Sequence, residues 1–307
     1  MIEANGLSKT YGEKKAVDDL SFTIRPGIVT GFLGPNGAGK STTMRLLLDL
    51  DEPTAGAATV NGKRYRDHKA PLQEVGALLE AKSVHSGRSA RNHLRALAAT
   101  NGISDKRVAE VIDIVGLHDV AGKRAGGFSL GMGQRLGIAS ALLGDPQTLL
   151  LDEPVNGLDP EGVLWIRNLL KALAAEGRTV FVSSHLMSEM AVTAEHLIVI
   201  GKGRLIADCS VAELTQQAAH DLVTVGSEDN ARLRGLLAGD SVTVESGADG
   251  SLEVSGLTAE QIGRIAASAG LALTRLTTHE ATLEEAFMAI TRSSLDYVAT
   301  INGEAVA

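Results

Sequence analysis

The chain has almost no cysteine and no excess of basic charge. One cysteine in 307 residues excludes a disulfide framework and a cysteine-based zinc site within one chain, and it fits a reducing, cytosolic setting. The net charge of −8 argues against nucleic acid as the main partner, because binding to a phosphodiester backbone needs a basic face. We therefore expect no nucleic-acid partner.

Long apolar runs are also missing. None approaches the ~18–20 residues that cross a bilayer, and the residues after Met1 form no apolar signal core. We expect a chain that is soluble on its own. Its hydrophobic content of 44% is ordinary for a globular protein, and its length favours two domains.

A glycine-rich segment lies between an expected strand and an expected helix. The apolar run 28–33 predicts a buried strand, and residues 42–49 predict a helix. Between them the chain matches G-x-x-x-x-G-K-[ST], the phosphate-binding loop, in Gly34, Pro35, Asn36, Gly37, Ala38, Gly39, Lys40, Ser41 and Thr42. The flanking strand and helix favour a nucleotide site over an ordinary glycine-rich turn. We expect Lys40 to reach the β and γ phosphates and the Ser41 hydroxyl to reach Mg²⁺.

Polar residues close two further expected strands. Asp152 and Glu153 follow the apolar run 148–151, and His185 follows the run 179–184. Ligands of parallel sheets bind beyond the carboxyl ends of the strands, so these side chains should lie beside the phosphate loop. Asp152 suits Mg²⁺, and Glu153 suits a general base that polarises water. Acidic residues before a proline are also common in turns, and a lone histidine is more often structural.

Two weaker signals leave alternatives open. Tyr11, in an expected polar loop that also contains Lys14 and Lys15, could stack on a purine base or be an ordinary half-buried tyrosine, and sequence position does not decide between them. The segment 126–135 could be a second anion-binding helix terminus. By itself, however, this segment is more typical of a flexible loop, with a helix beginning at Leu136.

The chain changes its pattern at about residue 221. Residues 84–143 read as a helical subdomain within the first domain. From 221 onward, strands and helices alternate in the order βαββαβ, which predicts a ferredoxin-like unit. This part carries no nucleotide or metal motif, so we expect an accessory or regulatory domain with a last helix at 282–290 and a mobile tail.

Together these motifs resemble the ATP-binding-cassette (ABC) family, specifically the ATPase subunit of a transporter. The resemblance covers residues 1–218 and implies an α/β fold: a P-loop NTPase cassette with a RecA-like core, an antiparallel β subdomain and a helical subdomain. An α+β domain at 219–307 completes the chain and resembles that of drug and antibiotic exporters. The matching motifs are Tyr11 for base stacking, Gly34–Thr42 for Walker A, Ser129, Leu130, Gly131 and Met132 for the signature, Leu149–Glu153 for Walker B, Asp159 for the D-loop and His185 for the switch histidine.

The motifs depart from the family pattern in two places. Leu130 and Met132 replace a glycine and a glutamine of the signature LSGGQ. Glu80 stands where the family has the Q-loop glutamine. Its carboxylate could still meet Mg²⁺ but cannot donate an amide hydrogen bond. Coupling to a membrane partner through this loop is therefore the function most affected.

The resemblance also implies partners. The chain has one Walker A loop and one signature, and in this family the signature of one subunit closes over the ATP of another. We therefore expect an ATP-sandwiched homodimer with ATP and Mg²⁺, bound to a separate transmembrane permease at the inner face of the cell membrane and powering export. The alternative is a non-transport ABC ATPase that acts on nucleic acid or ribosomes.

Overall fold

A computed structural model describes residues 1–79, 84–218, 222–239, 242–247, 250–278, 281–291, 299–301 and 304–306. Contacts divide the chain into two units. One comprises Met1–Val211 with Thr291–Ala307, and the other comprises Ala212–Ile290. The sequence instead places a domain boundary at residue 218, at the end of helix α8 (Val211–Ala218).

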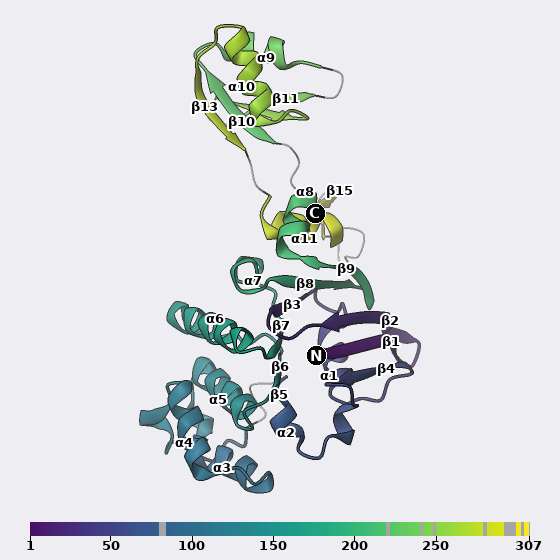
Figure 1. Ribbon diagram of the computed structural model, residues 1–307, viewed down its shortest axis with the longest axis vertical. Coiled ribbons are helices and arrows are strands. Elements are labelled where there is room, and N and C mark those ends of the chain that lie inside the picture. Colours follow the sequence, from purple (N-terminus) through teal and green to yellow (C-terminus); the bar gives the residue numbers. More distant parts are fainter. Residues whose placement is uncertain are drawn as a thin grey trace. The chain divides into compact units, whose positions relative to one another are not determined.

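The first unit is organised around a six-stranded sheet in the order β5-β6-β7-β3-β8-β9 (Figure 1). All neighbours pair in parallel except β8 and β9. Every residue of β3, β6 and β7 is buried, which explains their continuous apolar runs. The strands are β3 (Val29–Leu33), β5 (Val75–Leu78), β6 (Thr148–Leu151), β7 (Thr179–Ser183), β8 (His196–Gly201) and β9 (Arg204–Ser210).

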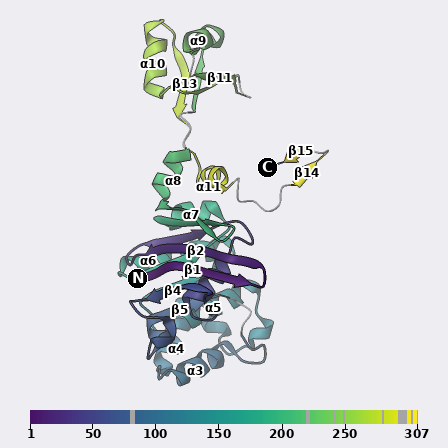
Figure 2. The ribbon, with the colours of Figure 1, turned by 90° about the vertical axis from the view of Figure 1, so that its right-hand side faces the viewer.

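A second sheet packs against the first through an aromatic core. It is antiparallel, in the order β2-β1-β4, with its strands side by side in Figure 2. Phe22 of β2, Phe32 of β3 and Phe181 of β7 have ring centroids 4.9 to 6.2 Å apart. The strands are β1 (Ile2–Tyr11), β2 (Lys14–Ile24) and β4 (Ala55–Val60).

The polar loop expected around Lys14 and Lys15 is wrong, because both residues belong to β2. Tyr11 likewise ends a strand rather than lying in a loop. The β1–β2 pairing shifts register three times, and Asp19 has a φ of +54°. These irregularities break the alternation of polar and apolar residues by which a strand is predicted.

The helices of the first unit begin at well-defined caps. The side chains of Ser89, Ser104, Ser129 and Asp159 each accept a backbone N–H at a helix start. The helices are α1 (Lys40–Leu47), α2 (Pro71–Glu74), α3 (Ala90–Thr100), α4 (Asp105–Ile114), α5 (Leu130–Leu142), α6 (Pro160–Ala175) and α7 (Met187–Thr193), and short 3₁₀ turns lie at Tyr65–Asp67, His118–Val120 and Ala125–Gly127.

Helices α3, α4 and α5 contact one another and form the helical part of the unit (Figure 1). Helix α5 begins at Leu130, so a flexible loop that lasts until Leu136 is wrong for these residues. Gly131 and Gly133 weaken the helical signal there, because glycine is a poor helix former. Capping by Ser129 and packing of the helix compensate for that weakness.

The second unit has its own sheet and its own apolar core. Its four strands are antiparallel in the order β11-β12-β10-β13, and α9 and α10 connect them. This order supports the ferredoxin-like assignment, which stays a prediction. The elements of this unit are α8, β10 (Val223–Ser227), α9 (Asn230–Leu237), β11 (Thr243–Ser246), β12 (Leu252–Ser255), α10 (Ala259–Ser268), β13 (Leu273–Thr278) and α11 (Leu283–Thr291). The short strands β14 (Ala299–Ile301) and β15 (Glu304–Val306) come later in the chain and belong to the first unit.

Candidate active site

The phosphate loop connects the end of β3 to the start of α1. Gly39 caps α1 with a φ of +104°, and a Cβ added there would lie 2.5 Å from the carbonyl oxygen of Ala16. Only glycine fits such a position. The Nζ atom of Lys40 donates to the carbonyl oxygens of Gly34, at 2.6 Å, and Pro35, at 3.3 Å. The lysine therefore folds back over the loop that precedes it.

Lys40 is a buried cation beside two carboxylates. The residue is 9% exposed, and this burial lowers the pKa of its ammonium group from the ordinary lysine value. The charges of Glu153 and Asp152 act in the opposite direction and raise that pKa. A polyphosphate in the loop would add further negative charge and favour the ammonium form in the same way.

The carboxylate of Asp152 connects Ser41 to the end of strand β7. Ser41 Oγ donates to Asp152 Oδ2 at 2.7 Å, and Ser183 Oγ makes a short hydrogen bond to Asp152 Oδ1. Ser183 Oγ also accepts the backbone N–H of Glu153 at 2.9 Å. Ser183 thus orients both acidic residues. Sequence reasoning missed its role, although its position at the carboxyl end of a neighbouring parallel strand was a usable signal.

The oxygens of Ser41 and Asp152 fit a magnesium ion. Hydroxyl and carboxylate oxygens are ligands that Mg²⁺ accepts, and it usually takes few protein ligands and completes its shell with water and phosphate oxygens. The described residues contain no group of three or more His, Cys, Asp or Glu side chains that could hold a metal. The third expected ligand, Glu80, lies outside the described residues.

Glu153 and His185 form a close pair. His185 Nδ1 lies 2.7 Å from Glu153 Oε2, and the His185 backbone N–H donates to the same oxygen at 3.3 Å. Glu153 has a φ of +49°, in the left-handed region that side-chain-bearing residues rarely adopt. Such strained conformations are held by their surroundings and concentrate at functional sites. The pair is therefore suited to proton chemistry at a fixed position.

Gln134 of α5 is a second residue whose role sequence reasoning missed. Its side chain is 3% exposed, and its Nε2 donates to the carbonyl oxygen of Glu153 at 3.0 Å. Buried amides are normally paired, so this contact satisfies the Gln134 side chain while supporting the strained residue.

Tyr11 presents an accessible aromatic ring at the end of β1. It is 48% exposed, and its hydroxyl donates to Asp51 Oδ2 at 2.9 Å. The Nζ atom of Lys9 lies 5.0 Å from the ring centroid. This exposure favours a ring available for stacking over a half-buried structural tyrosine.

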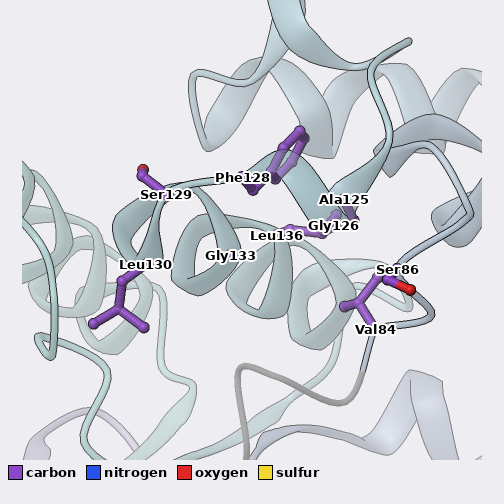
Figure 3. Close-up of a pocket in the computed structure, with 9 residues that line it drawn as sticks. All are labelled: Val84, Ser86, Ala125, Gly126, Phe128, Ser129, Leu130, Gly133 and Leu136. Carbon is purple, nitrogen blue, oxygen red and sulfur yellow. The ribbon is translucent and has the colours of Figure 1, made fainter.

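The signature residues form the start of α5. Ser129 Oγ accepts the backbone N–H of Met132 at 3.2 Å, and Leu130 is 53% exposed. Ser129 and Leu130 also line a pocket of about 410 Å³, together with Val84, Ser86, Ala125, Gly126, Phe128, Gly133 and Leu136 (Figure 3). In Figure 3 the side chains of Phe128 and Leu130 point away from each other at the start of the helix.

The structure brings five of the expected site residues together at the carboxyl edge of the central sheet, namely Lys40, Ser41, Asp152, Glu153 and His185. Tyr11, Ser129 and Asp159 make their hydrogen bonds elsewhere. Asp159 caps α6 by accepting the backbone N–H of Gly162 at 2.9 Å.

Comparison with known proteins agrees with this geometry. The family model described as "ABC transporter" matches residues 17–156, and a domain of unknown function (DUF8746) matches residues 221–284. The chain is 43% identical over 211 residues to the bacitracin transport ATP-binding protein BcrA of Bacillus licheniformis, covering 68% of this chain and 69% of that one. It is 34% identical over 292 residues to BcrA of Enterococcus faecalis, covering 94% and 95% of the two chains.

The chain belongs to the ABC transporter family. It is an ATP-binding subunit and an ATPase of that family. A solved ATP-binding subunit of an ABC transporter shares the cassette fold, with a TM-score of 0.65 and 26% identity over 71% of this chain and 92% of that one. Among the described residues, no helix is long and apolar enough to span a membrane. The named relatives are transport proteins, so the alternative of an ABC ATPase acting on nucleic acid or ribosomes gains no support.

Proposed function

We propose that this ABC ATPase powers the export of a drug, antibiotic or other small molecule through a separate transmembrane permease. The observation that carries the hydrolytic part of the proposal is the convergence of Lys40, the Ser41–Asp152 pair and the Glu153–His185 pair at one edge of the sheet. The bacitracin transport relative that matches nearly end to end supports an antibiotic-like substrate class.

The chemistry that these residues support is attack of water on the γ-phosphate of ATP. Glu153 accepts a proton from the attacking water, and His185 contacts the γ-phosphate. Lys40 holds the β and γ phosphates, and Tyr11 stacks on the adenine. Ser41 and Asp152 would hold Mg²⁺, and the ion would neutralise negative charge on the phosphates.

The site is completed by a second copy of the chain. The cassette carries one phosphate loop and one signature, so Ser129 of one subunit closes over the nucleotide of the other, which gives an isologous dimer with two shared sites. ATP then holds the two subunits together at their interface, and hydrolysis lets them separate. The permease places this dimer at the inner face of the membrane.

ATP turnover by the purified chain tests the catalytic assignments. Because Glu153 is the proposed base and Lys40 holds the phosphates, Glu153→Gln and Lys40→Ala should each lower kcat by at least about 100-fold. Two exposed positions supply matched controls, Glu228→Gln and Lys106→Ala, which should retain wild-type turnover. Unchanged turnover in Glu153→Gln would remove this residue as the base.

Export is tested in cells that express this chain together with a candidate membrane permease. Wild-type chain should raise resistance to a peptide antibiotic such as bacitracin, and the Lys40→Ala chain should not. Equal protection by both would contradict ATP-driven export.

A further inference from the structure

The bulky residue of the signature fits into a notch at Gly157, in the loop between Glu153 and α6. A Cβ added to Gly157 would lie 2.3 Å from Leu130 Cγ and 2.4 Å from Leu130 Cδ2. No side chain at residue 157 can coexist with Leu130 in its present place. The leucine of the signature and the glycine of this loop are therefore complementary in volume, because Leu130 occupies the space that a side chain at residue 157 would need.

The two backbones also approach each other closely at this point. A Cβ added to Gly131 would lie 2.7 Å from the carbonyl oxygen of Gly157. The first turn of α5 thus rests directly on the loop. Leu130 covers the place where they meet and still keeps 53% of its surface exposed.

Two further contacts continue along α5. One turn after Leu130, the amide of Gln134 donates to the carbonyl oxygen of Glu153. The next residue, Arg135, places its guanidinium 4.6 Å from the centroid of the Trp165 ring in α6, and its Nη1 donates to the carbonyl oxygen of Val115. We call the contacts Leu130–Gly157, Gln134–Glu153 and Arg135–Trp165 the α5 seam.

We infer that Leu130 is a positioning residue that couples the signature to the general base of its own chain. This inference rests on the proposed function, in which Ser129 binds ATP held by the partner subunit. Ser129 and Leu130 are adjacent, and the α5 seam ties their turn to the segment that carries Glu153. When the signature closes on the partner's ATP, the seam moves Glu153 toward its working position, so each site responds to the occupancy of the other.

A role limited to packing makes a different prediction. In that case Leu130 and Gly157 would affect stability alone, and the rate of hydrolysis by folded protein would not depend on their match. The two readings are separated by a double-mutant cycle in which the leucine is removed and the notch is filled.

The cycle uses Leu130→Gly, Gly157→Ala and the double variant, with kcat and KM for ATP measured on folded protein. Leu130→Gly leaves the notch empty and should lower kcat about fivefold, and Gly157→Ala creates the clash and should lower it at least about tenfold. The double variant should turn over at least as fast as Leu130→Gly, because the glycine removes all three atoms nearest to the added Cβ. Affinity of the single chain for ATP should stay within about twofold, because the phosphate loop is unchanged.

Gly177→Ala is the matched control for backbone strain. Gly157 has a φ of +74° and Gly177 a φ of +90°, so alanine is strained at both positions, but nothing lies within 4 Å of a Cβ at Gly177. Gly177 follows the far end of α6. Gly177→Ala should lower the melting temperature and leave kcat unchanged.

Trp165 provides a readout that is independent of turnover. It is the only tryptophan of the chain, and it lies in the α5 seam. In the Glu153→Gln background, ATP with Mg²⁺ should change its fluorescence, and adding Leu130→Gly should abolish most of that change while Gly177→Ala preserves it.

The inference is overturned if the fold losses in kcat caused by Leu130→Gly and by Gly157→Ala simply multiply in the double variant. It is also overturned if the ATP-induced fluorescence change of Trp165 survives Leu130→Gly. Either result can occur in a protein that hydrolyses ATP and dimerises normally, which leaves the proposed function intact. A wild-type chain with no ATPase activity would instead contradict the proposed function itself.

Discussion

At the scale of single residues, the candidate site depends on side chains that hold the acidic pair in place. The proposed base Glu153 has a left-handed backbone conformation, supported by Ser183 at its N–H and by Gln134 at its carbonyl oxygen. The sequence motifs predict Glu153 and Asp152 because their types and their position after a strand carry the chemistry. They do not predict Ser183 or Gln134, because those roles depend on contacts between elements far apart in the chain.

Ser183→Ala tests whether Ser183 orients the two acidic residues or only stabilises the fold. The change leaves the half-buried N–H of Glu153 without its Ser183 partner and releases Asp152, so we expect kcat to fall about tenfold or more and the free energy of unfolding to fall by ~1 kcal/mol. Thr30→Val is the control in the same sheet. The Thr30 hydroxyl is buried with no hydrogen-bond partner among the described residues, so its removal should leave turnover unchanged and stability equal or higher. Wild-type kcat in Ser183→Ala would exclude the orienting role.

His93 should make stability depend on pH. Burial, with a contribution from the charge of Arg88, lowers the pKa of this histidine below its ordinary value of 6.5. In the unfolded chain His93 therefore takes up its proton first as the pH falls. Its contribution to stability is present above pH 6.5 and is lost as the pH drops through the folded-state pKa. Thermal unfolding at pH 7.5 and pH 5.5 should show a smaller acid-induced loss for His93→Gln than for wild type. An equal loss in both would contradict this.

At the scale of elements, the sequence predicts structure well where the apolar residues follow a single regular pattern. It predicts poorly where bulges or glycines obscure that pattern. The buried strands β3, β6 and β7 are continuous apolar runs, and the pattern predicts all three. It does not predict the full length of β2, because bulges interrupt the alternation of that strand. It also places the start of α5 too late, since Gly131 and Gly133 obscure the helical pattern before Leu136, and the packing of Gly131 on the loop cannot be seen in a sequence pattern.

The glycines of α5 should respond differently to alanine. A Cβ added to Gly133 would have open space around it, with no contact within 4 Å, so Gly133→Ala should stabilise the chain by ~0.5–1 kcal/mol through helix propensity. Gly131→Ala should destabilise it, because the added Cβ would lie 2.7 Å from the carbonyl oxygen of Gly157. Thermal unfolding of the two variants measures both effects. The same sign of change in both would contradict the close approach of α5 to the loop.

At the scale of the whole molecule, the sequence pattern identifies the cassette better than it identifies the assembly. The glycine loop, the acidic strand end and the histidine follow one another in the chain, and the fold brings them to one edge of the sheet because parallel strands end together. Ser129 and Leu130 do not join this cluster in the single chain. Their chemistry makes sense at the nucleotide of a second copy, so the central claim concerns a dimer.

The most direct test of that claim is the molar mass of the Glu153→Gln chain, measured by light scattering on a sizing column. With ATP and Mg²⁺ the account predicts a dimer, because binding is intact while the hydrolysis that reopens the interface is blocked. Without nucleotide, or with Lys40→Ala added, the chain should be a monomer. A Glu153→Gln chain that binds ATP and remains a monomer at every protein concentration would contradict the account.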